Sequence, residues 1–249
     1  IPEAPAGAAI DQIGEPTAAH IAYAARLLEA LPPAVIEASH EPHGARAVVY
    51  ALLVGGDEPV RAAQLERLER FGDEGIADET RRMLPDVERL DPSARLPLID
   101  LALPALRRLS PRQYATFRDN VEALVEADRR IDLFEWTLHR ILLAHLRPHF
   151  ERVRVPRRHL PLSRLAHACS VVLSVLARLG GDGSEAVRKA FDEGAARLVS
   201  VTVHRLPEAQ CDLAAVDEAL TELARADVRA ADVLLHACAA CIAADGHVS

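Results

Sequence analysis

Apolar residues recur three and four positions apart in one segment of this chain after another, and proline, glycine or aspartate separates the segments. This spacing places the apolar side chains on one face of an α-helix, because the helix turns about once every 3.6 residues. Only Val153–Val155 and Leu198–Val203 hint at extended structure. The pattern therefore predicts an all-α protein, built as an array of antiparallel helical hairpins.

The proline, glycine and aspartate residues between the apolar segments indicate where the predicted helices begin and end. Pro42 is expected to open the third helix, since proline fits the first turn of a helix and breaks its interior. The segment 95–109 is apolar almost all round, so we expect a central helix there, kinked at Pro104. The expected helices cover residues 17–31, 34–39, 45–54, 60–71, 74–84, 95–109, 110–127, 132–146, 162–179, 184–199, 212–225 and 228–244.

The chain has 249 residues, which is enough for one large or two ordinary domains. We expect a flexible lead-in over 1–14 and a helical domain over 15–148 that ends in the hairpin 110–146. A basic linker is expected over 149–161, followed by a second helical subdomain over 162–249.

Both ends of the chain indicate a fragment. It opens on Ile1, and its single methionine is the internal Met83. It stops at Ser249, where a cap would open a further helix. We therefore expect a processed or partial chain, truncated at the carboxyl end as well.

The net charge of −8 argues against a general nucleic-acid binder, because neutralising phosphates requires a positive face. The stretch 145–164 is the exception, since its six arginines face only Glu151 as an opposing charge. A solvated linker is the favoured interpretation, and contact with an anionic membrane surface or an acidic partner is the alternative. The longest uncharged apolar runs are shorter than the roughly 18–20 residues that a membrane span needs.

The chain contains four cysteines, of which Cys169 and Cys238 fall in apolar series with helical spacing. Cys238 and Cys241 form a C-x-x-C pair, so a zinc or redox site must be weighed. A redox pair normally lies at a helix start, whereas this pair lies near a helix end. We therefore interpret these thiols as packing residues of a reducing compartment.

The acidic turn Asp128, Asp132 and Glu135 is the best candidate for a metal site, because carboxylate oxygens suit Ca²⁺ or Mg²⁺. The competing interpretation is structural, since Asp132 and Glu135 are also placed as helix caps. His40-Glu41-Pro42-His43 superficially resembles a zinc-protease motif, but its histidines are three residues apart instead of four. The common nucleophile and phosphate-binding motifs are absent from the sequence, so no catalytic or cofactor-binding residue is predicted.

Several residues are predicted to have structural roles. Ser110 and Gln113 have the spacing of a capping box around Pro111, in which each side chain bonds the main chain of the other. The predicted caps are Ser110, Gln113, Asp132 and Glu135, and the predicted core residues include Leu101, Phe117, Phe134 and Leu138.

Four stretches in this order carry a resemblance to a known family: Glu41–Leu53, Arg95–Leu106, Leu109–Phe117 and Ala127–Trp136. Together they resemble the carboxyl-terminal region of bacterial membrane-bound zinc metallopeptidases related to the HtpX protease. In that group the zinc-binding helix and the membrane spans lie upstream of this region, and no residue of this chain matches them.

The resemblance implies a non-catalytic accessory, regulatory or interaction domain of a membrane-anchored zinc metallopeptidase. Its zinc and its catalytic domain would lie upstream of Ile1, and that upstream domain would be the main partner, with protein substrates as further partners. The resemblance also implies a place on the cytoplasmic side of the bacterial inner membrane, with the membrane reached through the parent chain or weakly through 145–164.

The turns also resemble the helical tellurite-resistance TerB fold, whose members carry an A-D-G-x-[IV] turn. Ala244–Val248 matches this turn, whereas Ala127–Ile131 lacks the glycine. This resemblance implies the alternative function, a divalent-cation-binding or signalling module that uses Asp128, Asp132 and Glu135.

Overall fold

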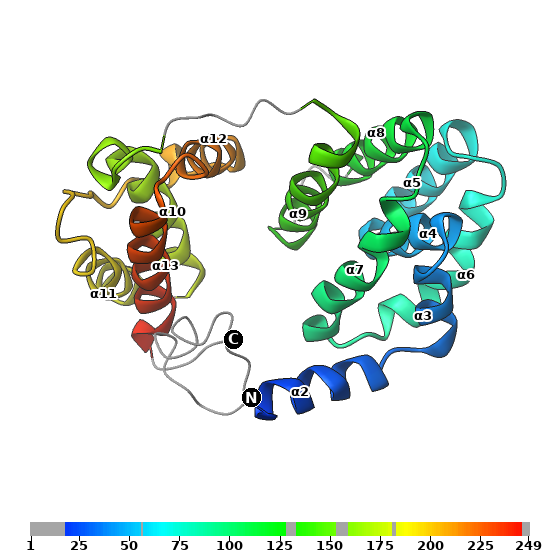
Figure 1. Cartoon of the computed structure of the whole chain (residues 1–249), viewed down its shortest axis with the longest axis horizontal. Coiled ribbons are helices and arrows are strands. Elements are labelled where there is room, and N and C mark those ends of the chain that lie inside the picture. The colour runs from blue at the N-terminus through cyan, green and yellow to red at the C-terminus, as the bar shows by residue number, and fades with distance from the viewer. Residues whose placement is uncertain (1–17, 56, 128–132, 153–158, 181–182, 246–249) are drawn as a thin grey trace. The chain divides into compact units, whose positions relative to one another are not determined.

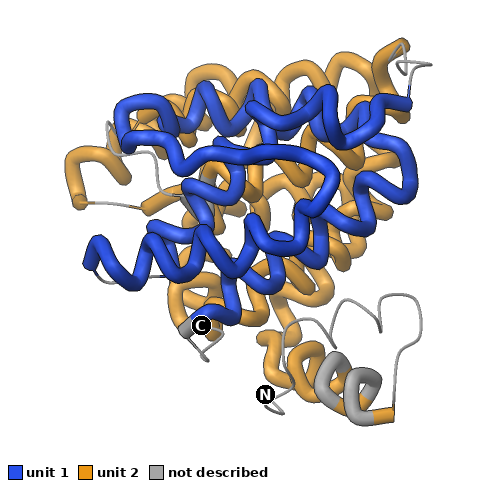
Figure 2. Tube along the Cα trace, turned by 90° about the vertical axis from the view of Figure 1, so that its left-hand side faces the viewer, with its two compact units in different colours: residues 1–17, 155–249 blue, residues 18–154 orange. Residues whose placement is uncertain are grey.

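A computed structural model describes residues 18–55, 57–127, 133–152, 159–180 and 183–245 of the chain. These residues contain twelve α-helices and no β-strand, which confirms the all-α prediction. Two compact units are present (Figure 2). We call residues 18–154 the larger unit and the described residues from 159 to 245 the smaller unit. No described helix is both long enough and apolar enough to cross a membrane.

The larger unit is a layered array of helices (Figure 1). Helix α4 contacts α3, α6, α7 and α8, so it lies at the centre of the unit. The helices of this unit are α2 (Ala18–Glu29), α3 (Pro33–Ser39), α4 (Pro42–Leu53), α5 (Glu58–Phe71), α6 (Ile76–Glu88), α7 (Pro92–Leu106), α8 (Pro111–Ala127) and α9 (Leu133–Phe150).

Helix α4 is the most buried element of the larger unit. Pro42 occupies its first turn, as expected, and ten of its twelve residues are buried. Tyr50 and Leu53 are among the largest fully buried side chains. Burial of a large apolar side chain contributes roughly 1.5–3 kcal/mol, so α4 organises the core of the unit.

A glycine allows α3 and α4 to approach each other closely. A Cβ added at Gly44 would lie 2.4 Å from the main-chain oxygen of Ala38. Real side chains do not tolerate such a contact, so this position requires glycine. The glycine thereby brings the short α3 against the start of α4.

Helices α6 and α7 differ from the sequence-based expectations, and α9 runs to Phe150 instead of ending at Leu146. Helix α6 continues through Pro85 to Glu88 instead of ending at Leu84. Helix α7 is central but is not buried all round, since Leu96 is 44% exposed and Asp100 and Pro104 are also exposed. One ridge of α7 therefore faces solvent, although its residue types are mostly apolar.

The predicted capping box at the start of α8 is confirmed. The Ser110 main-chain N–H donates to Gln113 Oε1 at 3.0 Å, and the Gln113 N–H donates to Ser110 Oγ at 3.3 Å. Phe117 and Leu138 are buried as predicted, and Leu101 is half-buried. The side chain of Phe134 lies outside the described residues.

The smaller unit packs α11, α12 and α13 against α10 (Figure 1). An isolated bridge pairs Leu160 with Ala226, so the end of the predicted linker 149–161 belongs to this unit. Residues 153–158 of that linker lie outside the described residues. The elements are η1 (Leu162–Arg164), α10 (Ala166–Leu179), α11 (Ser184–Ala195), η2 (Glu208–Gln210), α12 (Leu213–Leu223), α13 (Val228–Ile242) and η3 (Ala243–Asp245).

Extended structure was expected at Leu198–Val203, but these residues form no β-strand. Helix α11 ends at Ala195 and turns follow it. Further along, the Leu206 N–H donates to Ser174 Oγ at 2.9 Å, and Arg178 donates to the Leu206 oxygen. Side chains of α10 thus satisfy main-chain groups that a sheet would otherwise pair.

Candidate functional site

The acidic turn predicted as a metal site cannot be assembled from the described part of the chain. Asp128 and Asp132 lie outside the described residues, and Glu135 lies in α9 with its side chain outside them. Within the described ranges, no group of three or more His, Cys, Asp or Glu side chains is arranged to hold a metal ion. The cation-binding hypothesis for this turn stays a prediction.

The His40–His43 sequence forms the junction between α3 and α4. His40 is the C-cap of α3 and Glu41 is the N-cap of α4. Arg108 donates to the His40 main-chain oxygen at 3.3 Å and lies 3.7 Å from a Glu41 carboxylate oxygen. These residues hold the helix junction against the end of α7.

Three of the four cysteines lie close together in the core of the smaller unit. Cys169 on α10 and Cys241 on α13 are buried, and Cys238 is half-buried. Burial, together with the neighbouring Cys241 and Cys169, raises the pKa of Cys238 to about 12. Burial also raises the pKa of Cys169 to about 11 and that of Cys241 to about 11. Such thiols stay protonated at neutral pH, which suits packing better than redox chemistry.

An exposed aromatic side chain with two flanking cations ends α5. Phe71 is 51% exposed, which is unusual for a phenylalanine at a helix end that packs on two neighbours. The guanidinium carbons of Arg67 and Arg70 lie 4.9 Å and 5.1 Å from the centre of its ring. At these distances a guanidinium is attracted to the ring face. We call Arg67, Arg70 and Phe71 the Phe71 patch.

Two buried groups hold the turn that follows the patch. Asn120 Nδ2 on α8 donates to the Phe71 main-chain oxygen at 3.4 Å. Arg46 on α4, only 2% exposed, forms an ion pair with Asp73 and donates from Nε to the Pro42 oxygen at 3.1 Å. The α5–α6 turn is therefore fixed to the core, and the position of the patch is fixed with it.

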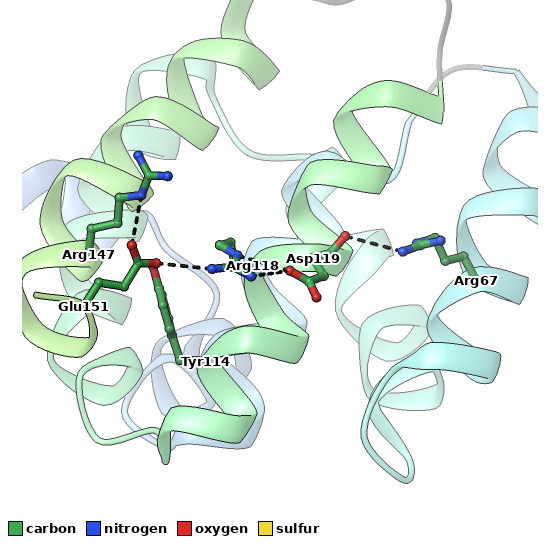
Figure 3. A network of polar contacts seen from close by, with 6 residues as sticks. All are labelled: Arg67, Tyr114, Arg118, Asp119, Arg147 and Glu151. Carbon is green, nitrogen blue, oxygen red and sulfur yellow. Dashed lines mark hydrogen bonds and ion pairs between the residues drawn. The ribbon is translucent and has the colours of Figure 1, made fainter. Parts of the chain in front are cut away.

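A polar network continues from the patch across α8 to α9 (Figure 3). Arg67 Nη2 donates to the main-chain oxygen of Asp119 at 3.5 Å. Arg118 pairs with the Asp119 carboxylate at 2.8 Å and with Glu151 at 3.3 Å. The hydrogen bond with Asp119 is the main cause that raises the pKa of Arg118.

The far end of this network fixes the end of α9. The Tyr114 hydroxyl donates to Glu151 Oε1 at 3.1 Å, and Arg147 lies 3.5 Å from Glu151 Oε2. The Tyr114 ring stacks on Phe150 with ring centres 4.3 Å apart, so the start of α8 meets the end of α9. Burial, followed by the bond with Glu151, raises the pKa of Tyr114 to about 12. The predicted hairpin is thus closed by a ring stack and a shared carboxylate.

The Phe71 patch was not predicted from the sequence. Its signal is present in the sequence, since two arginines lie one position and four positions before a phenylalanine at a helix end. An aromatic residue in a predicted helix is ordinarily assigned to the core, however, and only the packing of α5 on α6 and α8 exposes this one.

Comparison of the chain with protein-family models, with curated proteins and with solved structures finds no significant match.

Proposed function

We propose that this chain is a non-catalytic accessory domain of a membrane-anchored bacterial zinc metallopeptidase, and that it contacts substrates or partners or regulates the protease. The support comes from where the residues that carry the family resemblance lie. Glu41–Leu53 supplies the cap and the whole of α4, Arg95–Leu106 supplies most of α7, and Leu109–Phe117 supplies the capped start of α8. The motif residues thus build a helical scaffold.

The burial of α4 is the observation that carries this proposal. A stretch that served catalysis would place polar side chains at a surface or cleft, whereas this one places ten of twelve residues in the core. The outward-facing side chains of the larger unit include half-exposed Phe71. Exposed apolar side chains beside arginines are typical of surfaces that contact other proteins.

The gene sequence upstream of Ile1 tests the parentage. We expect it to encode an H-E-x-x-H helix, with both histidines one helical turn apart, and apolar spans of about 20 residues. A reading frame that extends upstream and encodes neither feature would overturn the proposal.

A protease assay tests the non-catalytic role. The purified chain is expected to leave casein intact, while the full-length parent hydrolyses it. Casein hydrolysis by the chain alone that a zinc chelator abolishes would contradict a non-catalytic role.

A further inference from the structure

We propose that the Phe71 patch is a binding site for an acidic linear segment of a partner protein, one that places an apolar side chain on the Phe71 ring and carboxylates on Arg67 and Arg70. This inference deepens the proposed contact role by naming the surface and the chemistry of its partner.

The charges of the patch are the first step. Neither Arg67 nor Arg70 forms an ion pair with a carboxylate of the described residues, whereas the nearby Asp73 and Asp119 carboxylates are engaged by Arg46 and Arg118. A guanidinium carries five N–H donors, and stacking on a ring leaves its edges available to carboxylates. The two arginines are therefore not engaged in an ion pair within the described part of the chain.

The apolar surface between these charges is the second step. Phe71 exposes 51% of its surface, and the guanidinium groups of Arg67 and Arg70 both lie near its ring. Aromatic residues and arginine are the types most enriched at the energetic centres of interfaces. An apolar side chain that covers the ring would exclude water from both cation–π contacts and strengthen the adjacent ion pairs.

The rigidity of the patch is the third step. Asn120 holds the Phe71 main chain, Arg46 holds the following turn through Asp73, and the Asp119 oxygen holds Arg67. A site fixed in this way loses little conformational entropy when a partner binds. Complementarity of charge selects an acidic partner, and the ring selects one with an apolar residue between its carboxylates.

Fluorescence anisotropy of a short labelled peptide, one leucine flanked on both sides by glutamates, tests the proposal with the whole 249-residue chain. We expect saturable binding of the peptide at about 0.1 M salt. Binding is expected to be lost near 1 M salt, because the Debye length there is only about 3 Å and the charges of the peptide and the arginines are screened from each other. The chain has a net charge of −8, so its overall charge opposes binding of an acidic peptide, and the patch variants distinguish the patch from the basic stretch 145–164. Peptides with lysines for the glutamates, or serine for the leucine, are expected to bind at least about tenfold more weakly.

Variants of the chain locate the site. Arg67→Glu with Arg70→Glu, and separately Phe71→Ser, are each expected to weaken binding of the peptide by about tenfold or more. The matched controls are Arg107→Glu with Arg112→Glu, which makes the same charge change at exposed positions, and Leu96→Ser, which removes another exposed apolar side chain. Both controls are expected to keep the parent affinity within about twofold. Circular dichroism checks that each variant is folded.

Three results would overturn the inference. The first is no binding of the acidic peptide by the parent chain. The second is equal weakening by the patch variants and their controls. The third is patch-dependent binding of a single-stranded oligonucleotide at least as tight as that of the peptide, which would assign the patch to nucleic acid. Failure of the peptide-binding test does not change the outcome of the upstream gene test. Failure of this inference can therefore be distinguished from failure of the proposed parentage.

Discussion

Single residues in this protein are constrained by what lies against them, and two cases in the larger unit show this most clearly. Gly44 is required because α3 lies against it, and Arg46 is buried because Asp73 and the Pro42 oxygen satisfy it. Burial lowers the pKa of Arg46, which reflects the cost of keeping the guanidinium charged away from water. Each residue leads to a measurable expectation.

Gly44→Ala is expected to destabilise the chain by about 1–3 kcal/mol, because the added methyl group would overlap the Ala38 carbonyl and force α3 away from α4. Urea unfolding followed by circular dichroism measures the change. Gly180→Ala is the matched control, since its Cβ would meet nothing closer than 3.7 Å, and we expect no loss of stability there. Equal effects of the two substitutions would contradict the close approach of α3 and α4.

Asp73→Asn is expected to cost about 1–3 kcal/mol, because the buried Arg46 would lose its charged partner. The control is Asp86→Asn, which breaks a pair with the exposed Arg89 and is expected to cost less than about 0.5 kcal/mol. Chemical denaturation of both variants and of the parent decides the difference. A change as small for Asp73 as for Asp86 would show that the ion pair does not stabilise the turn.

Whole elements were predicted best where the signal is local. The start of α8 is an example, since Ser110, Pro111 and Gln113 define a cap through bonds that span only three residues. The predicted end of α6 at Leu84 is four residues early, since the helix continues through Pro85 to Glu88. Proline removes one helical hydrogen bond but tertiary contacts can maintain the helix around it, and α6 packs closely on α4.

Removal of the capping box tests how much the local cap of α8 contributes to the stability of the protein. Ser110→Ala is expected to destabilise the protein by about 1 kcal/mol, because it leaves the Gln113 N–H without its side-chain acceptor. Gln113→Ala removes the reciprocal bond, and the double variant is expected to lose less than the sum of the two. Thermal unfolding of the three variants gives the coupling. Strict additivity would argue against a reciprocal box.

The contact between α10 and α13 predicts a pH dependence. Folding raises the pKa of Cys169 and of Cys241 from 9.0 to about 11, so the folded state favours the protonated thiols. Their contribution to stability is therefore complete below pH 9.0 and is lost as the pH rises towards about 11.

We expect the unfolding free energy of the parent to fall as the pH rises from 9.0 to about 11. The unfolding free energy of the Cys169→Ala variant is expected to fall less steeply over the same range. Urea titrations at several pH values measure both slopes. A parent and a Cys169→Ala variant with the same slope would contradict the role of this thiol.

At the scale of the whole molecule, the chain is divided between two compact units, each with buried residues of its own. One contiguous core cluster runs from Leu31 to Leu146 in the larger unit. In the smaller unit, a Cβ at Gly194 would lie 2.9 Å from the Ala237 oxygen and 2.9 Å from Cys241 Cβ, so α11 and α13 approach closely there. Each core is expected to support folding by itself.

Separate expression of 18–154 and 155–249 tests this division. We expect the first fragment to unfold in one cooperative transition that Gly44→Ala lowers as much as it does in the whole chain. Gly194→Ala is expected to lower the transition of the second fragment, because the added methyl group would overlap α13. A fragment without a cooperative transition would show that the unit does not fold alone.

The sequence by itself determined the helical class, most helix positions, the cap of α8 and the burial of Phe117 and Leu138. Those features depend on periodicity and on bonds between near neighbours, which a linear pattern records directly. The tertiary structure alone decided that Arg46 is buried beside Asp73, 27 residues away, and that Arg67 reaches Asp119, 52 residues away. It also decided that Phe71 faces solvent. Helix packing brings these distant partners together, and the local spacing of residues does not encode which residues far apart in the sequence will meet.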